Sequence, residues 1–141
     1  MAKSLTIGLI TGVQNIVATY VKSALLNAAK AFDVQVTLIE SDIALPAQAP
    51  SSRHALADRK LTVLASAFEL ESKGVDVIVT GDWRSEPFLK EVRKELTTPL
   101  ISFFEESVKY ITHHNLKKIG LVGNVVPVEY FRTHLPQVEF I

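Results

Sequence analysis

Two hydrophobic patterns alternate along the chain. Short, mostly apolar segments rich in β-branched residues predict strands, most of them buried on both faces. Longer segments between them carry apolar residues three or four positions apart, which is typical of amphipathic helices. The predicted strands are Leu5–Ile10, Val34–Glu40, Val75–Thr80, Pro99–Phe103, Lys118–Val122 and Val138–Ile141.

The predicted helices have recognisable apolar faces and ends. The first helix is expected to bury one face and to expose Lys22, Asn27 and Lys30. Its apolar face consists of Val17, Val21, Ala24, Leu25, Ala28 and Phe32. The second helix runs from about His54 to Lys73 and stops at Gly74, since glycine readily adopts the left-handed conformation that ends helices.

Three shorter helices complete the pattern. Ser85 is expected to cap the third helix, with Pro87 in its first turn. Its buried side is expected to carry Phe88, Leu89, Val92 and Leu96. The fourth helix spans about Glu105–His114, and Pro127 starts the fifth.

Strands that alternate with helices and lack hairpin turns predict a doubly wound parallel α/β sheet with right-handed crossovers. Ligands bind such sheets outside the carboxyl ends of the strands, so the loops that follow the strands are the informative ones. The longest, Ser41–Arg53, is either a lid or a solvated linker. The other loops are Thr11–Asn15, Gly81–Ser85, Phe104–Glu106 and Gly123–Val126.

Two parts of the chain are similar to each other in sequence. Ile7–Gly12 is similar to Ile119–Asn124, and Tyr20–Leu25 is similar to Tyr130–Leu135, at an offset of about 110 residues. We therefore expect residues 1–115 to form a first α/β half. Residues 116–141 are then either the start of a second, truncated half or the last β-α-β unit of a single domain. General likeness between any two β-α units is the alternative explanation.

Composition narrows the function classes. The 141 residues include 15 Lys and Arg, 15 Asp and Glu, and no Cys, so the formal net charge is zero. This balance argues against nucleic-acid binding and gives no reason to expect membrane binding. The absence of Cys excludes thiolate nucleophiles and thiolate metal sites. The first apolar segment is too short for a membrane span and lacks the features of a signal peptide, so we expect a cytoplasmic protein.

Polar residues follow the first predicted strand. Thr11, Gly12, Gln14 and Asn15 place hydroxyl, amide and backbone donors at a helix N-terminus, where a carboxylate or phosphate is stabilised. No G-x-G-x-x-G or G-x-x-x-x-G-K-[ST] pattern occurs, so a nucleotide cofactor is not supported. Simple capping of the helix explains these residues equally well.

The segment after the third predicted strand is the most unusual. Asp82 is a candidate base, and Arg84 is a candidate carboxylate ligand. Trp83 and Ser85 lie beside them. The alternative is a solvated Asp82–Arg84 pair with Trp83 packed as a cover. The His residues do not form a metal-binding pattern, so no metal site is predicted.

Four segments together resemble the aspartate/glutamate/hydantoin racemase superfamily. They are Gly74–Val79, Thr98–Ser102, Glu105–Ile111 and Lys117–Val122. The resemblance covers about Leu5–Phe131 and is strongest between Gly74 and Val122. It implies a flavodoxin-like half of a pseudosymmetric fold, with an active site between two halves, and isomerase chemistry on small carboxylates such as amino acids or hydantoins without a cofactor.

The resemblance also assigns roles to residues. It places substrate-carboxylate binding in the loop Thr11–Asn15, and a substrate-binding Arg near Arg53. Asn124 aligns with Gly12 of this loop when the two similar parts of the chain are compared. The first of the family's two catalytic Cys falls on Asp82, and the second is expected about 110 residues further on, beyond Ile141. The usual two-thiol racemisation is therefore not expected of this chain alone.

Two hypotheses remain open at this stage. The first is a racemase-like isomerase in which Asp82 replaces the first Cys. The second is a non-catalytic α/β module that binds a small anion or a protein. The apolar terminal segment Val138–Ile141 further suggests a fragment of a longer protein or a homo-oligomer that covers this edge.

Overall fold

The computed structural model describes residues 3–10, 15–43, 45, 52–121 and 128–141, and the side chains of residues 15–18 lie outside the description. The chain divides into two compact units, Met1–Phe103 and Phe104–Ile141. Each unit is described by itself below. None of the helices described is long and apolar enough to cross a membrane.

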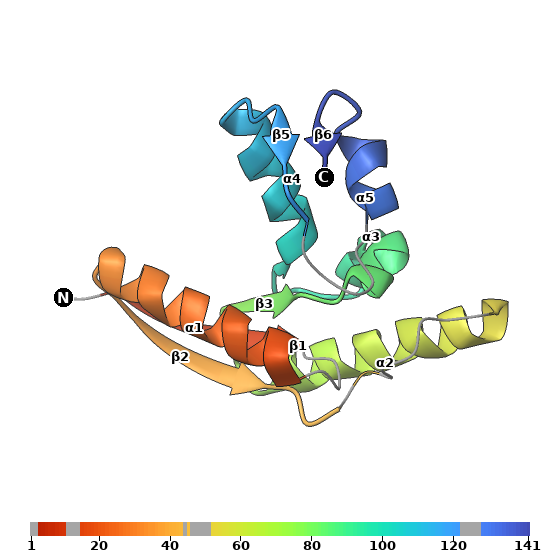
Figure 1. The fold of residues 1–141 in the computed structure, drawn as a ribbon. Helices are drawn as coiled ribbons and strands as arrows, with labels where there is room; N and C mark the ends of the chain where they lie inside the picture. The colour runs from red at the N-terminus through yellow and green to blue at the C-terminus, as the bar shows by residue number, and fades with distance from the viewer. Residues whose placement is uncertain (1–2, 11–14, 44, 46–51, 122–127) are drawn as a thin grey trace. The chain divides into compact units, whose positions relative to one another are not determined.

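The first unit contains a parallel sheet of four strands in the order β2-β1-β3-β4 (Figure 1). This confirms the predicted α/β class with a parallel sheet. The strands are β1 (Lys3–Ile10), β2 (Val34–Glu40), β3 (Val77–Thr80) and β4 (Leu100–Ser102). The helices of this unit are α1 (Asn15–Ala31), α2 (Arg53–Ser72), the 3₁₀ helix η1 (Trp83–Phe88) and α3 (Leu89–Lys94).

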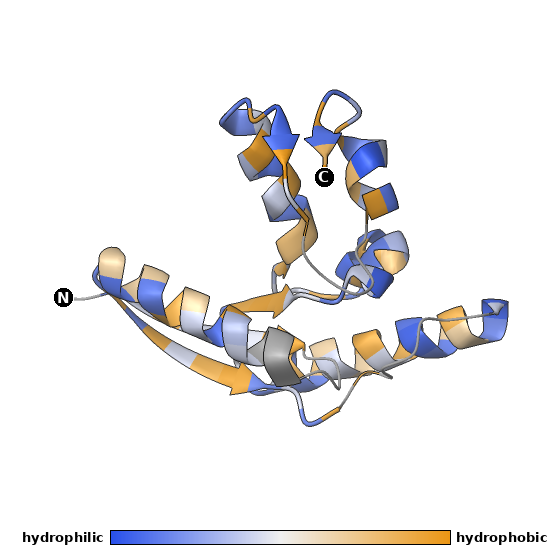
Figure 2. Ribbon diagram, viewed as in Figure 1, coloured by the Kyte–Doolittle hydropathy of each residue, from blue (hydrophilic) through white to orange (hydrophobic). Residues whose placement is uncertain are grey.

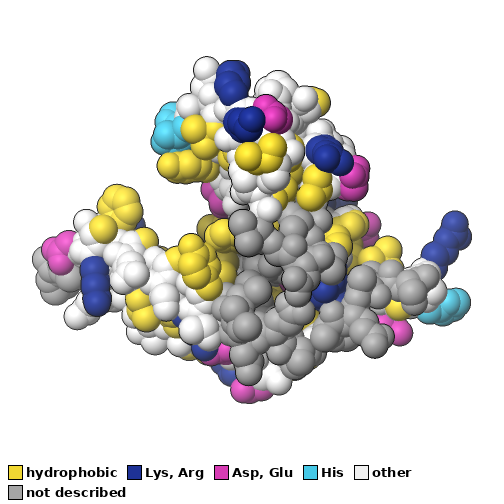
Figure 3. All heavy atoms as spheres, in the orientation of Figure 1, with side chains coloured by type: hydrophobic (Ala, Val, Ile, Leu, Met, Phe, Trp, Pro, Cys, Tyr) yellow, Lys and Arg dark blue, Asp and Glu magenta, His cyan; other side chains and the backbone are white. Residues whose placement is uncertain are grey.

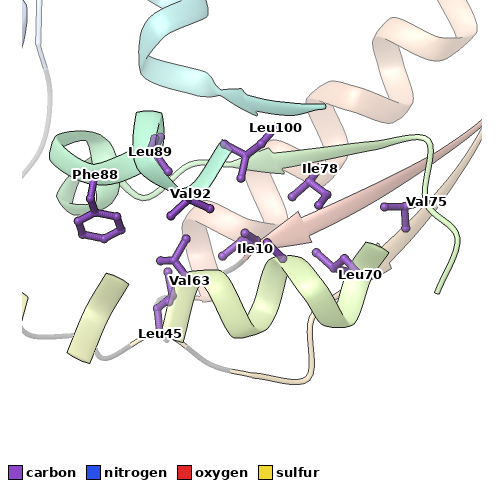
Figure 4. Close-up of a cluster of buried hydrophobic side chains, with 11 residues drawn as sticks. Ile10, Leu45, Val63, Leu70, Val75, Ile78, Phe88, Leu89, Val92 and Leu100 are labelled. Carbon is purple, nitrogen blue, oxygen red and sulfur yellow. The ribbon is translucent and has the colours of Figure 1, made fainter. Parts of the chain in front are cut away.

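The main core lies where strands meet α2, η1 and α3 (Figure 4). Glycine at position 8 lets α2 come close to β1, since an added Cβ would lie 3.1 Å from Leu70 Cδ1. The buried members are Ile10, Leu45, Val63, Ala67, Leu70, Val75, Ile78, Phe88, Leu89, Val92 and Leu100. Burial of this apolar surface is the main force that holds the first unit together.

The ends of α2 follow the sequence prediction closely. The Ser52 side chain accepts a hydrogen bond from the backbone N–H of Ala55 and caps the helix. Lys73 forms the C-cap, and Gly74 has a φ of +73°, a conformation that glycine adopts without steric cost. These local signals explain why the predicted and observed helix boundaries agree.

The apolar face predicted for α1 is partly wrong. Ala24 and Ala28 are exposed, and so is Phe32 just after the helix. The most buried side instead carries Ala29, with Leu25 half-buried. The spacing of the apolar residues predicted the helix correctly. Alanine, however, is too small and too weakly hydrophobic to show which face of the helix packs against the sheet. The ribbon of α1 alternates between hydrophobic and hydrophilic residues (Figure 2), and hydrophobic side chains are visible on the surface over α1 (Figure 3).

The start of the third predicted helix also differs. Ser85 does not cap it: residues Trp83–Phe88 form a 3₁₀ helix, and α3 begins only at Leu89. The Ser85 N–H donates to the Asp82 carbonyl at 3.0 Å, and the Ser85 hydroxyl donates to the Asp82 carboxylate. Because the hydroxyl has this side-chain partner, Ser85 lies buried inside the turn rather than at a helix end.

The second unit contains one further β-α-β unit. After α4 (Phe103–His113), the strands β5 (Lys118–Ile119) and β6 (Glu139–Phe140) pair in parallel, with α5 (Val128–His134) between them in sequence. The parallel pair β1 and β2 likewise has α1 between them in sequence. The buried core of this unit consists of Ile111, Phe131, Leu135 and Val138.

Glu71, near the end of α2, holds the turn that precedes β4. Its Oε1 accepts hydrogen bonds from the Thr97 hydroxyl at 2.7 Å, the Thr97 N–H at 2.8 Å and the Thr98 N–H at 2.7 Å. These donors, the Thr97 hydroxyl foremost, lower the pKa of Glu71 from its ordinary 4.5 to about 2. Glu71 therefore contributes stability that is fully present above pH 4.5 and is lost as the pH falls toward 2.

Replacing Glu71 with glutamine is expected to remove part of the acid sensitivity of the protein between pH 4.5 and 2. The measurement is the urea midpoint of unfolding at several pH values for the wild type and Glu71→Gln. Thr97→Val, which removes the hydroxyl donor, should give an intermediate pH dependence. Identical pH profiles for the wild type and Glu71→Gln would contradict this assignment.

Candidate functional site

Polar side chains gather where the central strands end. In the parallel register Ile10 lies opposite Thr80, and Thr80 lies opposite Ser102, so β1, β3 and β4 end at the same edge of the sheet. Thr80 and Ser102 are fully buried. The turn Gly81–Phe88 leaves the sheet at this edge, where open α/β sheets bind ligands.

Asp82 is held by a buried ion pair. Its Oδ2 accepts hydrogen bonds from Arg59 Nε at 3.0 Å and from the Ser85 hydroxyl at 2.5 Å. Arg59 Nη2 lies 2.9 Å from the same oxygen. The side chains of Asp82 and Arg59 are only 8% and 2% exposed. Asp82 is therefore not the solvated partner of Arg84 that one interpretation of the sequence suggested.

Arg59 comes from α2 and is not among the site residues predicted from the sequence. It lies on the buried face of that helix, where Val63, Ser66, Ala67 and Leu70 follow at helical spacing. A charged residue on an otherwise apolar face requires a buried partner of opposite charge. This was the signal in the sequence that could have pointed to an Arg59–acid pair.

Arg84 is less completely paired than Arg59. Its guanidinium lies over the Trp83 ring, 5.5 Å from the ring centroid, and its Nη1 is 4.0 Å from Asp82 Oδ1, beyond hydrogen-bond distance. The Arg84 Nε is buried and has no hydrogen-bond partner among the described residues. The whole side chain is 16% exposed. Arg84 therefore presents a desolvated donor beside the Asp82 carboxylate.

A second polar contact ties the same turn to the neighbouring strand. The Ser102 hydroxyl at the end of β4 donates to Glu86 Oε1 in η1. Together with the Arg59–Asp82 pair, this contact attaches η1 to both α2 and β4. The turn that carries Trp83 and Arg84 is thus held at two points.

The structure brings together only some of the predicted site residues. Asp82, Trp83, Arg84 and Ser85 form one cluster. Arg53 is exposed in the first turn of α2, and no hydrogen bond or ion pair joins it to this cluster among the described residues. Thr11, Gly12, Gln14 and Asn124 lie outside the described residues, as does the side chain of Asn15. Within the described ranges, no group of three or more His, Asp or Glu could hold a metal ion.

The four-stranded parallel sheet with its helices forms an α/β fold that also occurs in known proteins. Two solved structures match it with a TM-score of 0.71. One is an aspartate racemase homologue from Pyrococcus horikoshii OT3, 16% identical, with 100% of this chain and 64% of that chain covered. The other is a Cys-to-Ala variant of maleate isomerase from Pseudomonas putida S16 with maleate, 19% identical, with 99% and 62% covered.

These matches confirm the predicted resemblance at the level of the fold. The chain spans less than two thirds of the length of either structure. In sequence comparisons, no protein-family model and no curated protein matches this chain.

Proposed function

We propose that this chain belongs to a racemase- or isomerase-type protein that binds a small carboxylate at the carboxyl ends of β1, β3 and β4 and acts on it without a cofactor. The observation that carries the proposal is Arg84, whose Nη1 lies 4.0 Å from Asp82 Oδ1 and whose buried Nε has no hydrogen-bond partner within the part of the chain that the structure describes. The fold supports it, because both structural neighbours are named as a racemase homologue or an isomerase. Amino acids, hydantoins and dicarboxylates such as maleate are the substrate classes to test.

Arg84 is assigned the role of carboxylate ligand. A guanidinium donates two parallel hydrogen bonds to a carboxylate, and such charge-assisted bonds are strong where water is excluded. The Trp83 ring, whose centroid is 5.5 Å from the guanidinium carbon, stabilises the cation through a cation–π contact. The loop Thr11–Asn15, together with Arg53 and Asn124, stays a predicted contributor to substrate binding.

Asp82 is assigned the position of the first catalytic Cys. A base at this point would take the proton from the carbon next to the bound carboxylate. Arg59 and Ser85 occupy Oδ2, so Oδ1 is the oxygen that would accept this proton. Inversion also requires a second group that returns a proton from the opposite side of the carbon.

Replacing Arg84 with alanine is expected to weaken carboxylate binding by about 10- to 100-fold, the contribution of hydrogen bonds to a charged group. Isothermal titration calorimetry with L-aspartate, L-glutamate and maleate measures the affinity. Arg132→Ala, which removes an exposed guanidinium on α5, is the matched control and should bind as the wild type does. Equal affinity of Arg84→Ala and the wild type would overturn the assignment, and so would a wild type that binds none of the three.

Catalysis is tested separately from binding. The α-proton of each amino acid that binds is followed by NMR in deuterated water with the wild type and Asp82→Asn, after circular dichroism has shown that the variant is folded. Exchange that the wild type catalyses and the folded variant does not supports Asp82 as the base. Binding without exchange in the wild type would instead identify a non-catalytic anion-binding module.

A further inference from the structure

The buried charges around Asp82 leave at most one positive charge uncompensated. Arg59 Nε donates to Asp82 Oδ2 at 3.0 Å, and Arg84 Nη1 lies 4.0 Å from Asp82 Oδ1. These three residues are here named the Arg84 cluster. Glu86, on the same turn, adds a further negative charge, which accepts a hydrogen bond from the Ser102 hydroxyl. One bound carboxylate is therefore the most that these groups can balance.

The other basic side chains on α2 and α3 are engaged elsewhere or lie in water. Arg93 Nε donates to the Leu100 carbonyl at 2.9 Å, and Lys60 pairs with Glu91. Exposed cations interact weakly with an anion, because water screens their charge. The exposed ones on these two helices are Arg53, Lys90 and Lys94.

Cations elsewhere in the chain do not change this count. The segments outside the described residues contain no Lys or Arg. In the second unit, Lys109, Lys118 and Arg132 each form an ion pair with a glutamate of that unit. Among the residues that the structure describes, we therefore find no further buried cation with which a second carboxylate of a ligand could pair.

A second carboxylate is costly at this position. The side chains of the Arg84 cluster are largely buried, and burial of a carboxylate without a counter-charge is unfavourable. The turn is also fixed, because Phe88 at the end of η1 lies in the core (Figure 4) and Glu86 is bound to Ser102. A rearrangement that brings in a further cation is therefore unfavourable. A neutral amide of the same size as the carboxylate does not carry this cost.

We propose that the Arg84 cluster selects ligands with a single carboxylate and discriminates against dicarboxylates. This inference rests on the proposed function, in which Arg84 binds the carboxylate. The preferred substrate class consists of amino acids with a neutral side chain and of monoamides of dicarboxylic acids. The matching isomerase structure was solved with maleate, a dicarboxylate, so the preference differs from the ligand of that neighbour. Asp82 supplies the reason, since its carboxylate adds a negative charge where the resemblance places a Cys.

The first test compares three pairs of ligands that have the same size and differ in one carboxylate. They are L-asparagine with L-aspartate, L-glutamine with L-glutamate, and maleamate with maleate. Isothermal titration calorimetry of the wild-type chain at about pH 8, where all the carboxyl groups are ionised, measures the affinities. In each pair the amide is expected to bind at least about 10-fold more tightly than the acid, which still binds through its first carboxylate.

The outcomes separate this inference from the proposed function. Acids that bind as tightly as their amides, or more tightly, would overturn the selectivity and leave the carboxylate site standing. A wild type that binds none of the six ligands would overturn both.

The second test changes the charge of the cluster. Asp82→Asn removes its carboxylate, and in the folded variant the affinity of each acid relative to its amide is expected to rise by about 10-fold. Glu91→Gln is the matched control, because it removes one negative charge from an exposed ion pair and should keep the wild-type ratio. An unchanged ratio in folded Asp82→Asn would contradict the proposal. Should circular dichroism show that this variant is unfolded, the comparison of the ligand pairs on the wild type decides.

Discussion

Replacing Arg59 with alanine is expected to lower the free energy of unfolding by about 3–5 kcal/mol, because the change leaves the buried Asp82 carboxylate without its counter-charge. Urea unfolding followed by circular dichroism measures this loss. The variant also removes one of the two attachments of η1, so the turn that carries Arg84 is expected to loosen.

The control for Arg59 lies one residue further along the same helix. Lys60 makes an exposed ion pair with Glu91, and such pairs contribute little. Lys60→Ala is therefore expected to cost less than about 1 kcal/mol. The double variant Arg59→Met with Asp82→Leu removes both charges and should recover most of the lost stability. If Arg59→Ala costs no more than Lys60→Ala, the pair does not stabilise the fold.

Replacing Leu70 with alanine is expected to lower the free energy of unfolding by about 3–5 kcal/mol, because this fully buried side chain fills the space between α2 and β1. Its side chain lies against Gly8, which has no side chain of its own that could fill the cavity. Chemical denaturation measures the effect. Leu26→Ala, at an exposed leucine on α1, is the control and should change stability by less than about 1 kcal/mol.

A loss at Leu70 no larger than that at Leu26 would show that the Leu70–Gly8 contact does not stabilise the first unit. An m-value equal to that of the wild type would show that the change acts on the folded state and leaves the compactness of the unfolded chain unaltered.

Secondary structure was largely predictable from local pattern. The strand Val34–Glu40 was predicted with its observed bounds, and the end of α2 before Gly74 agreed. The periodicity of a strand and the left-handed conformation of a glycine depend on a few consecutive residues. Both can therefore be predicted directly from the sequence. The packed face of α1 was not predictable to the same degree, since Ala24 and Ala28 fit either a buried or an exposed side.

The candidate site was predictable only in part. The segment Asp82–Ser85 was singled out because charge and an aromatic ring follow a buried strand. What Asp82 contacts was not predictable, because Arg59 is 23 positions away in another element. The same holds for Glu86, whose partner Ser102 lies on β4.

The sequence by itself determined the alternation of strands and helices, the parallel character of the sheet and the loop on which the candidate site lies. Only the tertiary structure decided that Asp82 pairs with Arg59 and that Ser85 supports this carboxylate instead of capping a helix. It also decided that Arg84 keeps a buried donor with no partner among the residues described. The physical reason is that periodicity and turn preference act within a few residues. Charge pairing and burial instead depend on which distant elements the sheet order brings together.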